Sequence, residues 1–533
     1  MRGRFAQLKL VLQHIQDWQA AVCKKLEHLT DAGMTPHYDL ATLTAGCESE
    51  QLHRSGAIQS YGALIVLTPD GKTVTHASAN LATLTGIDAK EILATEVMLS
   101  IPWLYAALTF ALGRQKPSSN QLCSHITTGS AGWLDAWLTI SGEHLLVELL
   151  PSRSAPPLAA QRLQLPLLKT PGNAAELTAH HQALLLGVRE ITSFDRVMLY
   201  HFHDDFSGEV IAEEAREGLG SYMGLRFPAS DIPAIARRIY LVNPWRSIPD
   251  IETPISAVLG EGVSNLTNSL LRSVSPVHLK YLENMGVEAS FSLPIKIGGQ
   301  LWGLVTCHHP SPRVLDPQSC QLCASLAKSY AMGLGIFLAQ QRMQLIDSLS
   351  RRIESILQNL KSQDNPLESL ISQADRLLEL MDADGLAIAS GDEYVACGQA
   401  PEADAVSRLD QWFQQQSEVV IMVDDPAVQH PALTAILTPL AGLAAIKVDN
   451  VRQSSLASQK LRLYWFRVEE PRQVTWAGNP DKPRAENTQV PTLAPRHSFE
   501  RWVEVKSNTC RPWNNQDRLH CAHLRNALLR ATR

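Results

Sequence analysis

Apolar residues near the N-terminus recur at intervals of three or four. This spacing predicts a helix over residues 5–29, in which Gln19 takes the one polar position of the apolar stripe. The stripe is either a coiled-coil seam or a face that docks on the rest of the chain, and about three heptads do not separate these alternatives. Its members are Phe5, Leu8, Leu12, Ile15, Val22, Leu26 and Leu29.

From about residue 40 to residue 165 the pattern changes to short alternating runs. The stretch GALIVLTPDGKTVTHAS predicts two strands joined by a turn at Pro69-Asp70-Gly71, and WLTISGEHLLVELLPS predicts a second strand pair. Strand pairs with short helices between them are typical of an α+β domain with an antiparallel sheet. The proline-containing stretch SRSAPPLAAQ then predicts a linker.

Residues 175–340 predict a second α+β unit. The helix ELTAHHQALLLGVREIT precedes the strand RVMLYHF, the turn HDDFSG and the strand EVIAEE, and later strands are ASFSLPIKIGG and QLWGLVTCHH. A long helix is expected from about Gln318 toward Asp364, because apolar residues keep the three–four spacing there. A helix that leaves one domain and enters the next can transmit rotation or bending.

Residues 365–533 predict a third α+β unit, with strands GLAIAS, AAIKV and LRLYWFRVE and a C-terminal helix. Between them runs PRQVTWAGNPDKPRAENTQVPTLAPRHSF, an irregular excursion that is too long for an ordinary connection and is either disordered or functional. The aromatic residues Trp476, Phe499 and Trp502 argue against simple disorder. The chain as a whole therefore predicts three consecutive α+β domains with antiparallel sheets, joined by long helices.

Composition narrows the class of protein. The 533 residues carry a net charge of −6, which indicates no general affinity for nucleic acid. No apolar run approaches about 18 residues, so no membrane span is expected. The N-terminus has no signal-peptide core. The nine cysteines show no disulfide spacing, which favours a reducing cytoplasm.

The stretch FPASDIP, residues 227–233, holds one carboxylate, Asp231, on a turn stiffened by two prolines. One interpretation is a surface turn in which Asp231 or Ser230 is the N-cap of a helix beginning near Pro233. The other is that the turn presents Asp231 for a function, and other parts of the chain must decide.

Two further patterns favour structural explanations. His201 and His203, followed by two aspartates, lack a further ligand cluster, so a polar hairpin turn is the better interpretation than a metal site. Cys320 and Cys323 have no second pair and lie in a helical pattern, as buried thiols do. The chain has no phosphate-binding loop, nucleophile elbow or kinase catalytic motif, so no catalytic residue is assigned.

The residues around Asp231 have a joint chemical logic. Two arginines and several serines suit a ligand with two carboxylates, because guanidinium binds carboxylate bidentately. Two histidines and Asp231 suit ring nitrogens and carbonyls that hold or lose a proton. Aromatic residues suit a flat conjugated body. A tetrapyrrole has all these properties, although spacing alone does not single it out. The residues are Asp231, Arg246, Arg272, Ser275, His278, Ser290, Ser292, His308, Tyr200, Phe227 and Tyr281.

Long motifs carry a specific resemblance. RFPASDIPAIARRIY, NPWRSIPDI, SPVHLKYLENMGVEASFSLPI and GQLWGLVTCHH resemble the chromophore-binding GAF domain of bacterial phytochromes. CESEQLHRSGAIQSYGALIVL resembles the start of their PAS domain, and WFRVE, VTWAGNP and PRHSFERWVEV resemble the tongue of their PHY domain. The resemblance implies a helical extension at 1–39, PAS at 40–165, GAF at 166–340, and PHY at 341–533 with a tongue at about 463–505.

The resemblance also implies a cofactor and its contacts. Cys47 stands where the family forms a thioether to biliverdin, whereas Val277 stands where plant-type members carry their cysteine. It implies that Asp231 binds the pigment through its main-chain carbonyl, beside Ile232, and meets Arg496 of the tongue with its carboxylate. His278 serves the ring nitrogens, and His308 the D-ring carbonyl. Propionate contacts are implied for Arg246, Arg272, Ser275, Ser290 and Ser292, and a wall around the D-ring for Tyr200, Phe227 and Tyr281.

The function implied is that of a cytoplasmic red/far-red photoreceptor, and a homodimer through a helical bundle is expected. Light isomerises the bond between rings C and D, the hydrogen bonds at His308 and Asp231 rearrange, and the tongue switches between strand-like and helical structure. The chain departs from the family pattern at Ser60-Tyr61 and at Val468, and neither position is among the pigment contacts named above. An alternative function is that of the sensor portion of a light-regulated histidine kinase. The catalytic domain would then be absent from this chain, since no kinase motif follows Pro512. A second alternative is a pigment-free scaffold.

Overall fold

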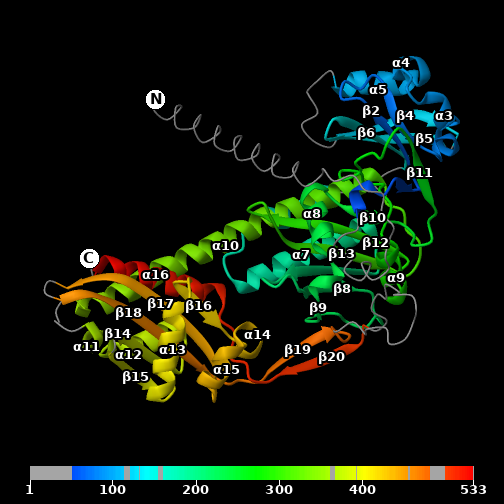
Figure 1. Cartoon of the computed structure of the whole chain (residues 1–533). Coiled ribbons are helices and arrows are strands. Elements are labelled where there is room, and N and C mark those ends of the chain that lie inside the picture. Colours follow the sequence, from blue (N-terminus) through cyan, green and yellow to red (C-terminus); the bar gives the residue numbers. More distant parts are fainter. Residues whose placement is uncertain are drawn as a thin grey trace, which may run out of the picture. The chain divides into compact units, whose positions relative to one another are not determined.

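The computed structural model describes residues 51–112, 121–130, 132–153, 160–360, 366–391, 393–453, 456–480 and 499–531. The predicted helix over residues 5–29, Cys47 and Arg496 lie outside these ranges. Within the described part of the chain, helices and three sheets follow one another along the sequence (Figure 1). Almost all strand pairs are antiparallel, so the predicted α+β class is confirmed.

The first sheet has seven strands and confirms both strand pairs predicted from the sequence. Its strands in order are β1 (Ala57–Gln59), β11 (Ile255–Gly260), β3 (Val74–Ser78), β2 (Ala63–Leu67), β6 (His144–Pro151), β5 (Gly132–Ser141) and β4 (Gln121–Gly129). β2 pairs with β3 and β5 pairs with β6, both antiparallel. β11 comes from much later in the chain and lies between β1 and β3, an insertion that the sequence pattern does not indicate.

Both faces of this sheet are buried. Alternate residues such as Ile65 and Val147 pack in one cluster with the short helices. Their neighbours Leu64 and Leu146 face the other way and pack against the later segment that contains Leu271. The helices here are η2 (Leu52–Arg54), α2 (Leu81–Thr85), α3 (Ala89–Ile92), α4 (Val97–Ser100) and α5 (Pro102–Leu112).

The second sheet has eight strands and includes every strand predicted between residues 196 and 309. In order they are β10 (Arg246–Ile248), β12 (Ala289–Ile297), β13 (Gln300–His309), β7 (Arg196–Phe202), β8 (Gly208–Ala215), β9 (Arg226–Phe227), β19 (Arg472–Ala477) and β20 (Arg501–Lys506). The last two strands belong to the excursion of the third unit. β19 joins the sheet through one parallel pair, Trp476 with Arg226.

Alternation along β12 separates the core of this sheet from a polar face. Phe291, Leu293 and Ile295 pack with α6 (Ala160–Leu168), α7 (Ala174–Thr192) and α10 (Pro317–Leu360). Ser290 and Ser292 lie between them in the sequence and so point to the opposite face. The helix α8 (Ala234–Val242) lies on that side, where Tyr240 bonds Ser292, and it follows η3 (Ala229–Asp231) in the sequence. The helix α9 (Pro276–Asn284) comes shortly before β12.

The long helix α10 runs from Pro317 to Leu360, close to its predicted bounds (Figure 1). Leu326 and Tyr330 pack in the second core, whereas Leu349 and Ile353 pack in the third. Among the described residues, α10 alone is long and apolar enough to cross a membrane by length and composition, with a mean hydropathy of 1.5 over its best window. Half of that window is buried within the protein, so this is weak evidence for a span.

The third sheet has five strands and buries both faces. In order they are β15 (Glu393–Gly398), β14 (Gly385–Ser390), β18 (Leu456–Val468), β17 (Leu440–Gln453) and β16 (Val420–Val423). Trp465 and Phe466, neighbours on β18, belong to separate clusters on the two faces. The helices are α11 (Pro366–Ile371), α12 (Ala374–Met381), α13 (Ala403–Gln415), α14 (Pro426–Gln429), α15 (Pro431–Leu437) and α16 (Asn515–Ala531).

The excursion after Val468 is regular at its start, where β19 lies, so the prediction that it is irregular is wrong there, and β20 follows directly after it. β19 and β20 pair antiparallel over their full length, with Trp476 directly opposite Trp502. Aromatic and β-branched side chains favour such strand pairs, and the prolines between them obscured this signal. Residues 481–498 lie outside the described ranges. The chain from β19 to β20 is called the tongue below.

Candidate functional site

The stretch FPASDIP forms a turn with a proline near each end. The helix α8 has Pro233 as its N-cap, and no side chain caps it. The interpretation of Asp231 or Ser230 as the N-cap is therefore wrong. Instead, the Asp231 carboxylate accepts a hydrogen bond of 3.1 Å from the hydroxyl of Tyr281. The turn thus holds this carboxylate against α9.

The helix α9 presents His278 and Tyr281 as a stacked pair, with ring centroids 5.9 Å apart. The Tyr281 ring also meets Phe499 of the tongue edge-on, at 5.0 Å between centroids. Ser275 is the N-cap of α9, and its hydroxyl makes no capping hydrogen bond. Burial, and then the charge of Arg246, lowers the pKa of His278 to about 4, so this imidazole is neutral at pH 7.

The strands β10, β12 and β13 align polar side chains on one face. Ser290 pairs with His308, and Ser292 pairs with Arg246, so each pair shares a face. Burial, followed by the charges of Arg196 and His278, lowers the pKa of His308 to about 3. The Nδ1 atom of His308 is buried and has no hydrogen-bond partner among the described residues.

Arg246 is anchored to residues 270–273, which follow β11 of the first sheet and precede β12 of the second sheet in the sequence. Its guanidinium donates to the backbone carbonyls of Leu270 at 3.1 Å, of Arg272, and of Ser273 at 3.1 Å. Burial lowers the pKa of Arg246. All of these acceptors are neutral carbonyls, so the positive charge of Arg246 is held in place without being neutralised.

Arg272 is buried and only partly satisfied. Its Nη1 donates to the carbonyls of Leu266 and Thr267, at 3.3 and 3.2 Å. Its Nε is buried without a hydrogen-bond partner in the described part of the chain. Burial, and then the charge of Arg246, lowers the pKa of Arg272 to about 9, which leaves it charged at pH 7. Within the described ranges, neither Arg246 nor Arg272 forms an ion pair with a carboxylate.

The predicted aromatic wall divides into two groups. Tyr200 and Phe227 are buried with ring centroids 5.8 Å apart, and Ile232 packs against their cluster. Tyr281 belongs to another cluster and reaches the site through its contacts with His278 and Asp231. The structure therefore brings the predicted residues of the second domain around one polar face, with aromatic side chains at two of its borders.

Sequence reasoning missed Tyr240, the last residue of the quoted motif RFPASDIPAIARRIY. Its hydroxyl lies 2.7 Å from the Ser292 Oγ, which ties α8 to the polar face. Burial raises the pKa of Tyr240, so it stays a neutral phenol that can donate. The four-residue spacing of Ile232, Ala236 and Tyr240, which runs from the turn into α8, could have found it.

Comparison with family models matches three successive stretches of the chain to three known domain types. Residues 47–152 match the PAS fold, residues 181–334 the GAF domain, and residues 349–533 the phytochrome region. Each match falls inside the corresponding predicted segment, whose boundaries stay predictions.

Full-length similarity extends across all three domains. The bacteriophytochrome of Xanthomonas campestris pv. campestris is 31% identical over 481 residues, which cover 88% of this chain and 75% of that protein. The chain belongs to the bacteriophytochrome family. It is thus a member of the phytochrome photoreceptors.

Two other relatives support the same family assignment. The bacteriophytochrome of Pseudomonas aeruginosa is 33% identical over 497 residues, covering 89% of this chain and 64% of that protein. Cyanobacterial phytochrome B of a Nostoc species is 31% identical over 505 residues, covering 91% and 66%. This chain therefore spans between 64% and 75% of the length of the three relatives.

Solved phytochrome structures have the same fold. A bacteriophytochrome of R. palustris superposes with a TM-score of 0.75 at 28% identity, covering 91% of this chain and 99% of that one. The photosensory core module of a Stigmatella aurantiaca phytochrome gives a TM-score of 0.75 at 29% identity, covering 94% and 99%. The three-domain arrangement predicted from the sequence is confirmed.

The other two patterns noted in the sequence have hydrogen-bonded or buried side chains in this bacteriophytochrome. His201 bonds the Trp302 carbonyl at 3.0 Å, and His203 pairs with Glu209 at 2.9 Å. No group of three or more potential metal ligands occurs in the part of the chain that the structure describes. Cys320 and Cys323 are buried in α10, and burial raises the pKa of both thiols. The hydrogen bonds of the histidines and the burial of the thiols are what the structural interpretations predict.

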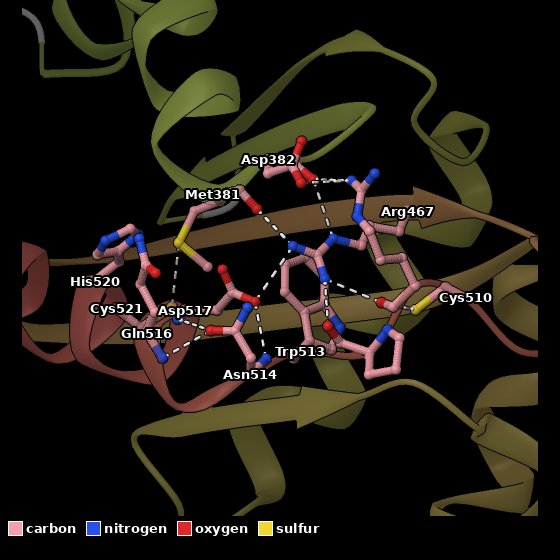
Figure 2. Close-up of polar contacts among 12 residues, drawn as sticks. Met381, Asp382, Arg467, Cys510, Trp513, Asn514, Gln516, Asp517, His520 and Cys521 are labelled. Atoms are coloured by element: carbon pink, nitrogen blue, oxygen red, sulfur yellow. Dashed lines mark hydrogen bonds and ion pairs between the residues drawn. The ribbon is translucent and has the colours of Figure 1, made fainter. Parts of the chain in front are cut away.

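The base of the bacteriophytochrome tongue contains a second buried arginine site, shown in Figure 2. Arg467, at the end of β18, pairs with Asp517 of α16 at 3.3 Å, and both side chains are at most 6% exposed. Its guanidinium also donates to the carbonyls of Met381 and Asp382, at 2.9 and 3.0 Å, and lies 3.7 Å from the Trp513 ring centroid. The strand that leads to the tongue is therefore fastened to the C-terminal helix.

Proposed function

We propose that this bacteriophytochrome is a red/far-red photoreceptor whose GAF domain binds biliverdin. The observation that carries the proposal is the pair of arginines without a carboxylate partner, half-buried Arg246 and buried Arg272, beside a face with unsatisfied buried nitrogens. A buried charge without a partner costs several kcal/mol, roughly 3–5 when one partner of an ion pair is removed. Biliverdin carries two propionate carboxylates, which would supply the missing partners.

The polar atoms of the face fit such a ligand. Arg272 Nε would donate to one propionate, and the hydroxyls of Ser275, Ser290 and Ser292 would add hydrogen bonds. Arg246 would attract the other carboxylate while its backbone bonds fix its orientation. Binding of the two carboxylates in this way requires the charges of Arg246 and Arg272 and also the positions that these side chains have in the structure.

The opposite part of the site suits the pyrrole rings. Neutral His278 would exchange hydrogen bonds with the ring nitrogens, together with the backbone carbonyl of Asp231 next to Ile232. The unpartnered Nδ1 of His308 would meet the D-ring carbonyl. Tyr200 and Phe227 would pack around the D-ring on one side and Tyr281 on the other. The bound bilin supplies absorption of red light and isomerisation between rings C and D.

The tongue would carry the signal. Phe499 touches Tyr281, whose hydroxyl bonds Asp231, so a rearrangement at the site reaches the tongue through two contacts. We propose that Arg496, outside the described residues, meets the Asp231 carboxylate, and that the tongue changes from the strands β19 and β20 to a helix. The long helices α10 and α16 would pass this change onward.

Attachment of the pigment is assigned to Cys47, which lies outside the described residues. Cys47→Ala should still bind biliverdin, because the propionate and nitrogen contacts remain, but the pigment should be lost on a denaturing gel. A serine variant of a buried scaffold thiol, Cys320→Ser, serves as the control that keeps its pigment. Pigment that stays with Cys47→Ala under denaturing conditions would refute this assignment.

We further propose that the chain has no catalytic turnover of its own, acts in the cytoplasm, and dimerises through a helical bundle. Because it spans only part of its relatives, a second candidate is the sensor portion of a light-regulated histidine kinase. In that case a kinase domain on the same polypeptide, or on a partner, would respond to α16.

The test is an absorbance spectrum of the protein mixed with biliverdin, in darkness and then after red and far-red light. Reversible exchange between a red and a far-red band is the expected result. Failure of the spectrum to change on mixing would contradict the proposal, because it would show that the pocket does not take the pigment.

A further inference from the structure

The carboxylate of Glu148 is completely buried between the first two domains, and the roles assigned above do not use it. Glu148 lies on β6 of the PAS sheet, directly opposite Trp137 on β5. Its exposed fraction is 0%. It accepts hydrogen bonds from the Ser269 hydroxyl at 2.6 Å and from the amides of Leu270 and Leu271, at 3.1 and 2.8 Å. A PAS side chain thus holds a segment of the GAF domain.

The same segment is held from its other side by Arg246. The Leu270 amide donates to Glu148, while the Leu270 carbonyl accepts from Arg246 at 3.1 Å. The carbonyls of Arg272 and Ser273 also accept from Arg246. Residues 269–273 therefore lie between a carboxylate of one domain and a guanidinium of the other.

This segment carries the second buried cation. The Arg272 amide donates to the Ser269 hydroxyl at 3.0 Å, and that hydroxyl donates to Glu148. The Gln59 side chain bonds the Arg272 carbonyl at 3.4 Å. Three residues after Arg272 the chain reaches Ser275, the N-cap of α9. A displacement of Glu148 would therefore be transmitted to both arginines and to the start of α9.

The charges around Glu148 also indicate a link between Glu148 and the two arginines. All three of its hydrogen-bond partners donate to Glu148, which favours the carboxylate form beside half-buried Arg246 and buried Arg272. Burial raises the pKa of Glu148, and its three hydrogen bonds and the charge of Arg246 oppose that effect. A buried carboxylate is costly unless its hydrogen bonds are made, so a group used only to fill space would be apolar.

We propose that Glu148 is a positioning residue that sets Arg246 and Arg272 at the spacing required by the two carboxylates of the bilin. This inference rests on the proposed function, because it assigns the arginines to the propionates. It adds that the PAS domain shapes the pigment pocket from outside, through one side chain that does not touch the pigment.

The experiment compares the affinity of the full chain for biliverdin with its affinity for biliverdin dimethyl ester, which lacks both carboxylates. Wild-type protein should prefer the free acid, and Glu148→Gln should reduce this preference by about 10-fold or more, because a charge-assisted hydrogen bond is lost. Ser269→Ala keeps the charge of Glu148 and removes one of its donors, so it should reduce the preference by a smaller factor.

Asp135→Asn is the matched control. Asp135 lies on β5, is 1% exposed, and accepts from the His125 amide rather than from residues 269–273. It should leave the preference for the free acid unchanged. An equal drop in Asp135→Asn would overturn the inference, because it would reveal general damage to the PAS sheet.

Two further outcomes are decisive. If Glu148→Gln strengthens the preference while Ser269→Ala leaves it unchanged, Glu148 acts only as a counter-charge and the positioning role is wrong. If wild-type protein binds neither compound, the proposed function fails first. Wild-type binding with an unchanged preference in Glu148→Gln would reject the positioning role alone. Should Glu148→Gln fail to fold, Ser269→Ala against Asp135→Asn makes the same comparison.

Discussion

The pigment pocket and the tongue base both contain arginines that are buried or half-buried, but the surroundings of the charge differ. At the tongue base, Arg467 has a carboxylate partner, several backbone acceptors and an aromatic face. In the pocket, Arg246 and Arg272 have only backbone carbonyls among the described residues, and Arg272 Nε has no acceptor. One site is electrostatically complete and the other is not.

The difference separates a structural site from a binding site without reference to any ligand. A satisfied buried ion pair is costly to break, since removal of one partner leaves the other charge unpaired. A buried cation without a carboxylate partner lowers the stability of the fold until an anion binds to it. By the same criterion, Arg462 is structural, because it pairs with Asp410 in the PHY core.

The largest effect is expected at the tongue base. Arg467→Met should lower the free energy of unfolding of the apoprotein by about 3–5 kcal/mol, because Asp517 is left buried without its partner. Urea denaturation followed by tryptophan fluorescence measures this. The control Arg408→Met breaks an exposed pair with Asp404 and should cost at most about 1 kcal/mol. Equal losses in the two variants would show that the buried pair is not special.

The pocket should respond to acid. His278 has a folded pKa of about 4 against 6.5 for an ordinary histidine, so the unfolded chain binds more protons between these values. The free energy of unfolding should therefore fall as the pH drops from 7 to 4.5, with about 2–3 kcal/mol of the loss due to His278. Urea denaturation of wild type and His278→Gln at both pH values measures the difference. Parallel losses in the two proteins would contradict the assigned pKa.

A smaller effect is expected where the pocket meets the tongue. Tyr281→Phe removes the hydroxyl that donates to Asp231 and should cost about 1 kcal/mol in the free energy of unfolding. It should also speed proteolysis of the tongue, because the contact with Phe499 loses its anchor. Tyr105→Phe on the partly exposed side of α5 is the control and should change neither quantity.

The smallest change in apoprotein stability is expected for Arg272→Met. It removes a buried charge with no carboxylate partner, which offsets the lost bonds to two carbonyls, so the free energy of unfolding should change by less than about 1 kcal/mol. In contrast, the stabilisation that biliverdin adds should fall, as measured by the shift in unfolding midpoint on pigment binding. A loss as large as that of Arg467→Met would remove the distinction between the two sites.

Local pattern was sufficient for much of the fold. The pairs β2–β3 and β5–β6 follow from alternation and a proline–glycine turn, and α10 follows from its spacing. The insertion of β11 beside β1 could not be predicted this way, because alternation shows that a strand exists and not which distant strand it pairs with. The strands of the tongue were missed for another reason, because the prolines between them obscured the strand pattern.

The same distinction between local pattern and long-range pairing applies to the residues of the site. Motifs brought Arg246, Arg272, His278 and His308 to attention, and the structure places them around one face. The bonds from Arg246 to residues 270–273 and the buried carboxylate of Glu148 depend on contacts between domains far apart in sequence. Those contacts are tertiary, so no spacing in the sequence records them.

The most direct test of the central claim is the affinity of wild-type apoprotein for biliverdin against that for biliverdin dimethyl ester, measured in darkness by absorbance titration. The account predicts that the free acid binds at least about 10-fold more tightly, because only its carboxylates can pair with Arg246 and Arg272. Equal affinities would contradict the account, since they would show that the buried arginines serve the fold and not the ligand.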